Sequence, residues 1–189
     1  MAYGIHIKII MHNMVSMKIL DVKNHHQRDF YRLNYEYLDW ATRRLKQEYG
    51  IEFVPFDEQY TEAIAKYASD SVEEYLHIGS EGHVAVLSEN GTVFGMGLLK
   101  KLKEEVSEIK RMYIQPTFRG NGYGKHLLEH LIDRAYEKEY RVIMLDSVKF
   151  MSTAHHLYQS HGFEFCDPYP ESEIAEELQK HWIFMKKIL

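Results

Sequence analysis

Residues 108–128 read EIKRMYIQPTFRGNGYGKHLL, the most distinctive pattern in the chain. The first part is rich in β-branched and aromatic residues, which favour a half-buried strand. Pro116 should end that strand near Ile114, because proline cannot donate to a central ladder. Glycines at alternate positions follow, and then leucines at helical spacing. Strand, glycine turn and helix in this order aim backbone N–H groups and the positive end of a helix dipole at one spot, which suits a phosphate group.

Two common phosphate-binding loops can be tested against the spacing of these glycines. A Walker loop needs glycine, four residues, Gly-Lys and then Ser or Thr, but Arg119 and His126 stand at its first and last positions. A dinucleotide fingerprint that starts at Gly120 needs its third glycine where Lys125 stands. The pattern that fits is Arg-x-x-Gly-x-Gly, which begins at Arg119.

With this loop, the EIKRMYI run before it and the Gly-Lys-x-Leu-Leu segment after it, the chain resembles the GNAT family of N-acetyltransferases. In that family the loop joins the fourth strand to the third helix and binds the pyrophosphate of acetyl-CoA, so the resemblance implies acetyl-CoA as co-substrate. The fourth strand splays from its neighbour and its backbone pairs with the pantetheine arm. The N–H of Met112 would then polarise the acetyl carbonyl. The implied cofactor-binding residues are Met112, Tyr113, Ile114, Arg119, Gly120, Asn121, Gly122, Tyr123, Gly124 and Lys125.

A second segment, AHHLYQSHGF from Ala154 to Phe163, resembles the Ala-x-x-Leu-Tyr-x-x-x-Gly-Phe segment near the end of GNAT cores. In many members its tyrosine points at the thioester sulfur and can protonate the departing thiolate. A phenol with a pKa of about 10 suits that leaving group. The resemblance therefore implies Tyr158 as the catalytic acid, and the alternative is that Tyr158 packs with Phe163 in the core. Met151 stands where many relatives have an asparagine that touches the cofactor.

Acetylation of an amine also requires a proton to leave the ammonium group. The resemblance implies Glu108 as the catalytic base, because it precedes Arg119 by eleven positions, the placement of the glutamate that acts through water in lysine-acetylating members. The alternative is a structural ion pair with Lys110, and His83 and Asp146 are further candidate bases. A dedicated base is not obligatory, since a thioester reacts readily once an amine is held beside it.

The composition is that of a globular protein, with 45% hydrophobic and 27% charged residues among 189. This length predicts one domain over residues 1–189, in which residues 1–13 form an N-terminal extension.

Cys166 is the single cysteine, which excludes an internal disulfide and indicates a cytoplasmic protein. No apolar run is long enough to cross a bilayer. The net charge of −5 argues against nucleic acid as a partner and favours a cationic acceptor such as a free amine.

Hydrophobic periodicity predicts the elements of the fold. Before the glycine loop these are a strand at 15–22, helices at 24–49, 58–67 and 71–76, a hairpin of strands 83–87 and 92–99 about Asn90-Gly91, and a strand at 106–114. After the loop they are a helix to about 138, a strand at 141–146, a helix at 151–161 and strands at 163–165 and 182–185. Hairpins and βαβ crossovers in one chain predict an α+β (mixed α/β) fold. The GNAT resemblance implies a central, mixed, mostly antiparallel twisted sheet flanked by helices, with splayed fourth and fifth strands.

The resemblance places the acceptor between the first helix and the last hairpin. The aromatic and acidic residues of these regions are Tyr35, Glu36, Tyr37, Asp39, Trp40, Tyr169 and Glu171. The acceptor could be a small molecule or a peptide, and a homodimer is one assembly that the family uses. The sequence thus predicts an acetyl-CoA-dependent N-acetyltransferase that acts on a primary amine by direct attack in a ternary complex.

Two other functions were weighed against this one. A GNAT-like domain could bind CoA as a sensing or interaction module without turnover, and would then need neither Tyr158 nor Glu108. The run His126-Leu-Leu-Glu-His130 also spells the His-x-x-Glu-His pattern of a zinc hydrolase, with both histidines on one helix face. Because the same helix already supplies an apolar face and a phosphate-binding end, and no third ligand is evident, we expect no metal site.

Overall fold

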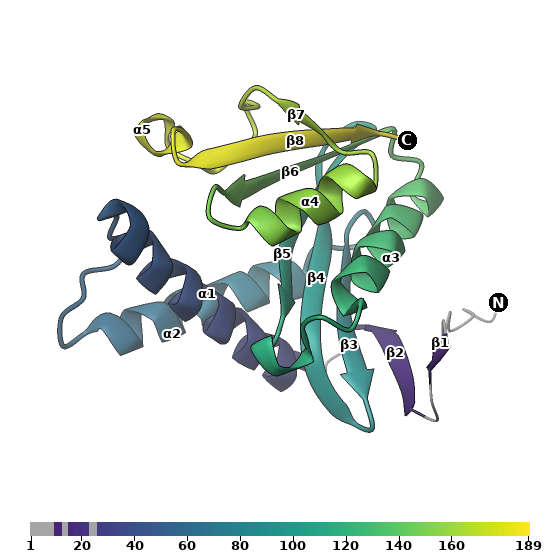
Figure 1. Ribbon diagram of the computed structural model, residues 1–189, viewed down its shortest axis with the longest axis horizontal. Helices are drawn as coiled ribbons and strands as arrows, with labels where there is room; N and C mark the ends of the chain where they lie inside the picture. Colours follow the sequence, from purple (N-terminus) through teal and green to yellow (C-terminus); the bar gives the residue numbers. More distant parts are fainter. Residues whose placement is uncertain (1–9, 13–14, 23–25) are drawn as a thin grey trace.

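The computed structural model of the protein describes residues 10–12, 15–22 and 26–189. The strands are β1 (Ile10–His12), β2 (Val15–Asp21), β3 (His83–Glu89), β4 (Thr92–Lys103), β5 (Val106–Ile114), β6 (Val142–Val148), β7 (Glu164–Cys166) and β8 (Trp182–Ile188). The helices are α1 (Gln27–Tyr49), α2 (Tyr60–Leu76), α3 (Tyr123–Glu137), α4 (Ser152–Ser160) and α5 (Glu176–Gln179), and a 3-10 turn, η2, spans Pro116–Phe118. Figure 1 shows how they surround one sheet.

The strands form a single eight-stranded sheet in the order β1-β2-β3-β4-β5-β6-β8-β7. All neighbours run antiparallel except β5 and β6, which are parallel and connected through α3. A parallel pair needs such a crossover, whereas antiparallel neighbours can be joined by short turns. The mixed, mostly antiparallel sheet flanked by helices confirms the predicted fold class.

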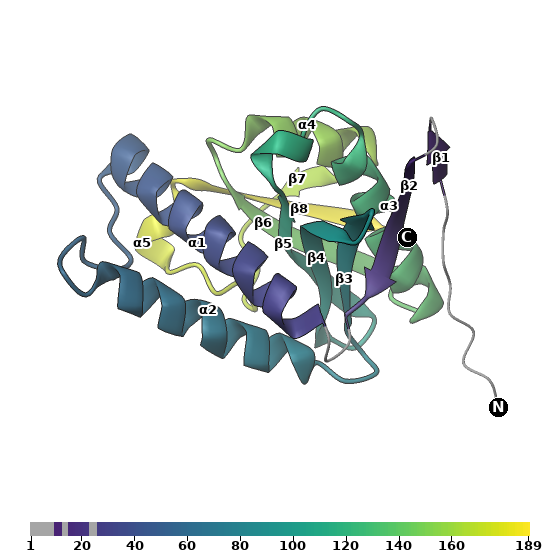
Figure 2. The ribbon, with the colours of Figure 1, turned by 90° about the horizontal axis from the view of Figure 1, so that it is seen from below.

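Helices cover both faces of this sheet (Figure 2). Side chains of β3 alternate between the two faces, as the period of a strand requires. Val84 and Val86 pack in the cluster that contains Phe30 of α1, whereas Ala85 and Leu87 pack in the cluster beneath α3 and α4. The sheet is therefore buried on both sides, with α1 and α2 on one face and α3 and α4 on the other.

The parallel strands β5 and β6 separate after a short shared stretch. They pair only over Val106–Glu108 and Val142–Met144. Just beyond, the register between β4 and β5 shifts, and Arg111 has a φ of 56°, in the left-handed region. A bulge of this kind bends a strand away from its neighbour. The separation leaves the backbone of residues 112–114 facing a gap and confirms the predicted splay of the fourth and fifth predicted strands.

Several turns also agree with the sequence predictions. Gly50 ends α1 with a φ of 68°, and its N–H donates to the Lys46 carbonyl. Asn90 and Gly91 both have positive φ values and close the hairpin between β3 and β4, as a tight hairpin turn requires. Residues 24 and 25, where the first predicted helix was expected to begin, lie outside the described residues.

Other boundaries were predicted wrongly. The two helices expected at 58–67 and 71–76 are one helix, α2, in which the Ser71 hydroxyl donates to the Tyr67 carbonyl and is buried. Strand β4 continues to Lys103 instead of ending at residue 99, because its charged end pairs with the start of β5. Strand β1 and the short α5 were not predicted, and most of the expected N-terminal extension lies outside the described residues. None of the helices in the described ranges is long and apolar enough to span a membrane.

Candidate active site

The loop between β5 and α3 has a backbone that favours glycine at two positions. Gly120 and Gly122 have φ values of 83° and 79°. A Cβ at either residue would meet no atom within 4 Å, so the backbone conformation, and not a lack of space, requires glycine. Gly122 is the N-cap of α3 and supplies no side-chain cap. The N–H groups of the first turn are therefore oriented for an anionic ligand.

Side chains fix the start of this loop and add positive charge beside it. Arg119 Nε donates to the Ile114 carbonyl at 2.9 Å, which ties the loop back to the end of β5. Asn121 Nδ2 donates to the Phe118 carbonyl at 3.2 Å and closes the turn. Lys125 follows in the first turn of α3 with 56% of its side chain exposed. Two cations thus flank the glycine turn, as a diphosphate site needs.

Two of the predicted cofactor-binding residues have side chains committed elsewhere, and a third, Gly124, has none. The Tyr123 hydroxyl donates to Glu89 at 2.8 Å, and the Tyr113 ring lies 5.9 Å from the Tyr37 ring. A Cβ at Gly124 would meet only an ordinary contact, at 3.6 Å from Leu157. These positions can contribute to a ligand site through backbone groups only.

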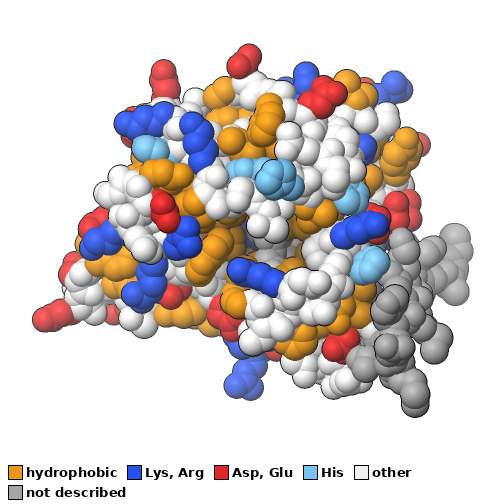
Figure 3. All heavy atoms as spheres, viewed as in Figure 1, with side chains coloured by type: hydrophobic (Ala, Val, Ile, Leu, Met, Phe, Trp, Pro, Cys, Tyr) orange, Lys and Arg blue, Asp and Glu red, His pale blue; other side chains and the backbone are white. Residues whose placement is uncertain are grey.

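A cavity of 470 Å³ lies where β5 and β6 separate. It is lined by residues of α1, α2, β5, β6 and α4 and by the segment that leads into β8, so it is assembled from most of the chain. Figure 3 shows the molecule hollowed near the middle of the face of Figure 1, between α4 and the glycine loop. Met112, which lies on the part of β5 that β6 leaves unpaired, therefore lies next to this space.

Tyr158 and Asp146 supply polar groups to this cavity. Tyr158 on α4 is only 8% exposed, and burial, together with Tyr37 and Asp146, raises the pKa of its phenol. One carboxylate oxygen of Asp146, Oδ2, is buried and has no hydrogen-bond partner in the described part of the chain. Burial also raises the pKa of Asp146, against the opposing charge of Lys110. Tyr158 also contacts Phe163, with ring centres 5.9 Å apart. The packing contact given as the alternative role of Tyr158 is therefore present, and it does not remove Tyr158 from the cavity wall.

Glu108, the predicted base, does not line the cavity. It is 1% exposed, accepts a hydrogen bond from the Tyr169 hydroxyl, and lies 3.5 Å from Lys110 Nζ. Burial raises the pKa of Glu108, whereas Lys110 and Tyr169 lower it. Lys110 is 2.9 Å from Glu173 as well, and both Lys110 and Glu173 line the cavity. Glu108 therefore lies behind the cavity wall and contacts it through Lys110.

Among the seven residues predicted to surround the acceptor, only Tyr37 lines the cavity. Glu36 accepts a hydrogen bond from Gln115 at 2.8 Å, and Asp39 accepts one from the Tyr60 hydroxyl at 2.9 Å. The other four also lie outside the cavity. The Tyr35 ring contacts Tyr31 and the Trp40 ring contacts Phe150, whereas the Tyr169 hydroxyl donates to Glu108 and Glu171 forms an ion pair with Lys103. The first helix contributes to the cavity through Tyr37, but the contacts of the other six side chains were not predictable from residue type.

The sequence analysis missed Arg111, which also lines the cavity. Its guanidinium lies 5.6 Å from the ring centre of Tyr37 and 5.9 Å from those of Tyr67 and Tyr75. The signal that could have found it is its place in the EIKRMYI run, in the strand that was expected to splay from its neighbour. A bulged strand breaks the alternation of its side chains, so Lys110 and Arg111 are adjacent and still line the same cavity.

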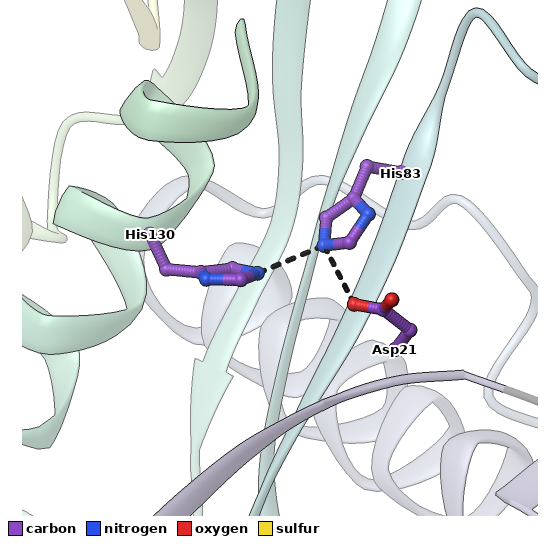
Figure 4. Close-up of side chains that lie close together, drawn as sticks. All are labelled: Asp21, His83 and His130. Atoms are coloured by element: carbon purple, nitrogen blue, oxygen red, sulfur yellow. Dashed lines mark hydrogen bonds and ion pairs between the residues drawn. The ribbon is translucent and has the colours of Figure 1, made fainter. Parts of the chain in front are cut away.

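The histidines that suggested a zinc hydrolase separate in the structure. His126 Nδ1 lies 3.5 Å from Glu129, whereas His130 Nε2 lies 2.9 Å from His83 Nε2, which is also 3.5 Å from Asp21 (Figure 4). Asp21, His83 and His130 could each offer one ligand atom to a metal ion. Burial, together with the nearby cations Arg134 and Lys138, lowers the pKa of His83. His83, a further candidate base, does not line the cavity.

Comparisons with known proteins give a consistent family. The model described as Acetyltransferase (GNAT) family matches residues 37–163. An uncharacterised N-acetyltransferase of Dictyostelium discoideum is 42% identical over 65 residues, which are 34% of this chain and 30% of that protein. The uncharacterised N-acetyltransferase YjgM of Escherichia coli is 29% identical over 130 residues, which are 66% of this chain and 73% of that protein.

The matches cover different shares of the relatives. Three curated relatives, from Dictyostelium discoideum, Bacillus subtilis and Azospirillum brasilense, are matched over 30%, 56% and 56% of their own lengths. Among solved structures, the PaiA N-acetyltransferase of Thermoplasma acidophilum, in complex with coenzyme A, is 19% identical and has a TM-score of 0.69. That match covers 92% of this chain and 99% of the other, and it is a likeness of fold.

Proposed function

This chain belongs to the GNAT acetyltransferase family, and from that membership we propose that it is an acetyl-CoA-dependent N-acetyltransferase. It transfers the acetyl group to a primary amine of its acceptor by direct attack in a ternary complex. The observation that carries the proposal is the position of Tyr158. The Tyr158 phenol lines the same cavity as Met112 of β5. At this point β5 has separated from β6, and its end leads directly into the glycine loop.

The glycine loop and β5 hold the co-substrate. The uncapped first turn of α3 and the amides of Gly120, Gly122 and Gly124 receive the diphosphate, with Arg119 and Lys125 as flanking cations. The pantetheine arm pairs with the backbone of residues 112–114, which β6 leaves open. With the diphosphate at the loop and the pantetheine arm running back along β5, the thioester would reach the cavity beside Met112.

Residues of the cavity then handle two protons. Acetyl-CoA supplies an activated acyl carbon, and in the transfer a nitrogen–carbon bond forms while the carbon–sulfur bond breaks. The N–H of Met112 donates to the carbonyl oxygen as negative charge develops there. Tyr158, whose raised pKa keeps the phenol protonated, gives its proton to the departing sulfur and regains one from the nitrogen, which loses its second proton as the tetrahedral adduct collapses to the amide.

The proton lost by the ammonium group goes to a carboxylate. We propose Asp146 for this role, because its buried and unpartnered Oδ2 belongs to a residue that lines the cavity. Glu108, which the family resemblance implied, is the second candidate. It would act through Lys110 and the cavity wall, since its own oxygens are engaged by Tyr169 and Lys110.

A panel of primary amines assayed for release of the CoA thiol with DTNB tests the proposal. We expect turnover with at least one amine, and Tyr158→Phe should lower kcat by about 100-fold, the lower end of the effect of a general acid. Tyr136→Phe is the matched control, because Tyr136 is 62% exposed on the outer face of α3. Equal turnover by Tyr158→Phe and wild type would remove the proposed acid. CoA binding without thiol release from any amine would identify a binding module instead of an enzyme.

A further inference from the structure

Arg111 is a cation in the cavity wall that forms no ion pair with a carboxylate in the described part of the chain. Its Nε is buried and has no hydrogen-bond partner in the same residues. The tyrosines 75, 37 and 67 surround it, and the Tyr67 hydroxyl accepts one long hydrogen bond, at 3.4 Å, from Arg111 Nη2. Asp146 is within electrostatic reach of Arg111, but it interacts with Lys110 as well. Tyrosine rings attract a guanidinium through their faces, but they carry no countercharge.

The neighbouring cation is neutralised, which makes the contrast informative. Lys110 Nζ lies 2.9 Å from Glu173 and 3.5 Å from Glu108. Burial alone would lower the pKa of Lys110, but Glu108, Asp146 and Glu173 hold it above its ordinary value. The protein thus surrounds one of two adjacent cations with carboxylates and the other with neutral phenols.

The backbone is strained to place Arg111 there. A φ of 56° lies in the left-handed region, which is unfavourable for a residue that is not glycine. Strain of this kind persists where the surroundings enforce it, and it is concentrated at ligand sites. The same bulge turns the side chain toward the cavity beside that of Lys110. The position of Arg111 is therefore a built feature of the cavity.

The cavity also contains the complementary charge. Asp146 lines it, and the unpartnered Oδ2 of Asp146 is an acceptor without a donor in the described residues. The charge of Arg111 lowers the pKa of Asp146, so the two groups are within electrostatic reach of one another. A charged or polar group without a hydrogen-bond partner in a shielded site destabilises the protein. A ligand that carries an acceptor for Arg111 and a donor for Asp146 would satisfy both groups at once.

We propose that the acceptor is an amino acid with a free carboxylate, held by Arg111, and a free amine, held beside Asp146 and Tyr158. A guanidinium binds a carboxylate through two parallel hydrogen bonds, which fixes the orientation of the acceptor as well as its charge. The rest of the lining is mostly apolar and favours an apolar side chain on the acceptor: Leu38, Ala41, Leu45, Val54, Ile64 and Trp182. This inference rests on the proposed function and names the acceptor of the same site.

Matched acceptors test it. L-leucine and L-phenylalanine are compared with their carboxamides and with the corresponding decarboxylated amines, isoamylamine and phenethylamine, in the thiol-release assay. We expect kcat/KM for the amino acids to exceed that for either neutral analogue by about 100-fold, mainly through KM, the effect of a charge-assisted bidentate pair. Arg111→Gln should lower kcat/KM for the amino acids to that of their neutral analogues and so remove this preference. Arg111→Lys should restore part of it, since it keeps the charge but loses the planar fork.

Calorimetry separates a wrong acceptor from a wrong function. Binding of the same amino acids and carboxamides to the CoA complex is measured for wild type, Arg111→Gln and the control Arg141→Gln, whose side chain is 74% exposed and pairs with Glu105. Preference for the amino acid that Arg111→Gln abolishes and Arg141→Gln retains would support the inference, even if no thiol were released. Equal binding of amino acid and carboxamide by wild type, in the assay or in the calorimeter, would overturn it and leave acetyl transfer to other amines standing.

Discussion

The two halves of the site are built by different means. The half proposed to receive CoA is one continuous stretch, residues 112–125, which presents backbone N–H groups from a bulged strand, two glycines with positive φ and a helix N-terminus. The half proposed to receive the acceptor is a cavity lined by side chains of α1, α2, β5, β6, α4 and the segment before β8. Backbone recognition is specified locally, whereas the acceptor site depends on how distant elements pack.

The difference extends to electrostatics. Beside the glycine loop the cations are exposed, and they serve a ligand that brings its own strong negative charge. In the cavity wall and directly behind it, the charged groups Glu108, Lys110, Asp146 and Arg111 are largely shielded from solvent, and each affects the pKa of a neighbour. A change to the loop should therefore alter CoA affinity alone, whereas a change in the cavity should alter rate and pH dependence.

The largest effect should come from a negative charge in the loop. Gly122→Asp places a carboxylate at the N-terminus of α3, beside the proposed diphosphate. At about 4 Å and an effective dielectric constant of about 20, repulsion between unit charges is roughly 4 kcal/mol, so CoA should bind about 1000-fold more weakly in calorimetry.

Gly91→Asp is the matched control for this change. Gly91 has a φ of 78° and, like Gly122, would present its Cβ to open space, but it lies in the hairpin between β3 and β4. Both variants should lose about 1 kcal/mol of stability to the strained backbone. Only Gly122→Asp should lose CoA affinity, and unchanged affinity in that variant would contradict the assignment of the loop.

A smaller effect should separate the two candidate bases. Asp146→Asn should lower kcat by about 100-fold and abolish the acidic limb of the rate profile, because a general base contributes at least that much. Burial raises the pKa of Asp146, so in the wild type this limb should lie above the range of an ordinary aspartate. Rates are measured between pH 5 and 9 with CoA at saturation.

Glu108→Gln is the companion measurement. Glutamine keeps an oxygen for the Tyr169 hydroxyl, so we expect kcat within about tenfold of the wild type and an intact acidic limb. If instead the limb disappears in Glu108→Gln and survives in Asp146→Asn, then Glu108 is the base and Asp146 only binds the acceptor.

The smallest effect concerns the support of the CoA half. His83 on β3 contacts His130 on α3 at 2.9 Å, with Asp21 at 3.5 Å, and burial, Arg134 and Lys138 lower the pKa of His83 to about 4. The folded state therefore keeps His83 neutral, whereas the unfolded chain takes up a proton near pH 6.5. The free energy of unfolding should fall as the pH drops from about 6.5 toward 4, by about 2 kcal/mol between pH 7 and pH 5.

Denaturant unfolding at pH 7 and pH 5 measures this loss. His83→Asn should reduce the difference between the two pH values, because no group at that position titrates. His156→Asn, a change at an exposed histidine of α4, should leave the difference as in the wild type. An unaltered difference in His83→Asn would show that acid acts on the fold elsewhere.

The comparison of the two halves also explains what the sequence could predict. The strand that ends before Pro116, the glycine turn, α3 and the position of Tyr158 are local patterns, and the structure places them as expected. The acceptor half was predicted only as a region. Arg111 enters the cavity because a bulge overrides strand alternation, and Tyr169 turns from the predicted acceptor wall to Glu108 because a buried carboxylate needs a donor. Those are tertiary effects that residue type and spacing do not contain.

A crystal structure of the protein with acetyl-CoA tests the account most directly. We predict diphosphate oxygens within hydrogen-bonding distance of the amides of residues 120–125, the pantetheine amides paired with the backbone of residues 112–114, and the thioester sulfur within reach of the Tyr158 hydroxyl. A coenzyme bound along another surface, or a thioester that does not enter the cavity between β5 and β6, would contradict it.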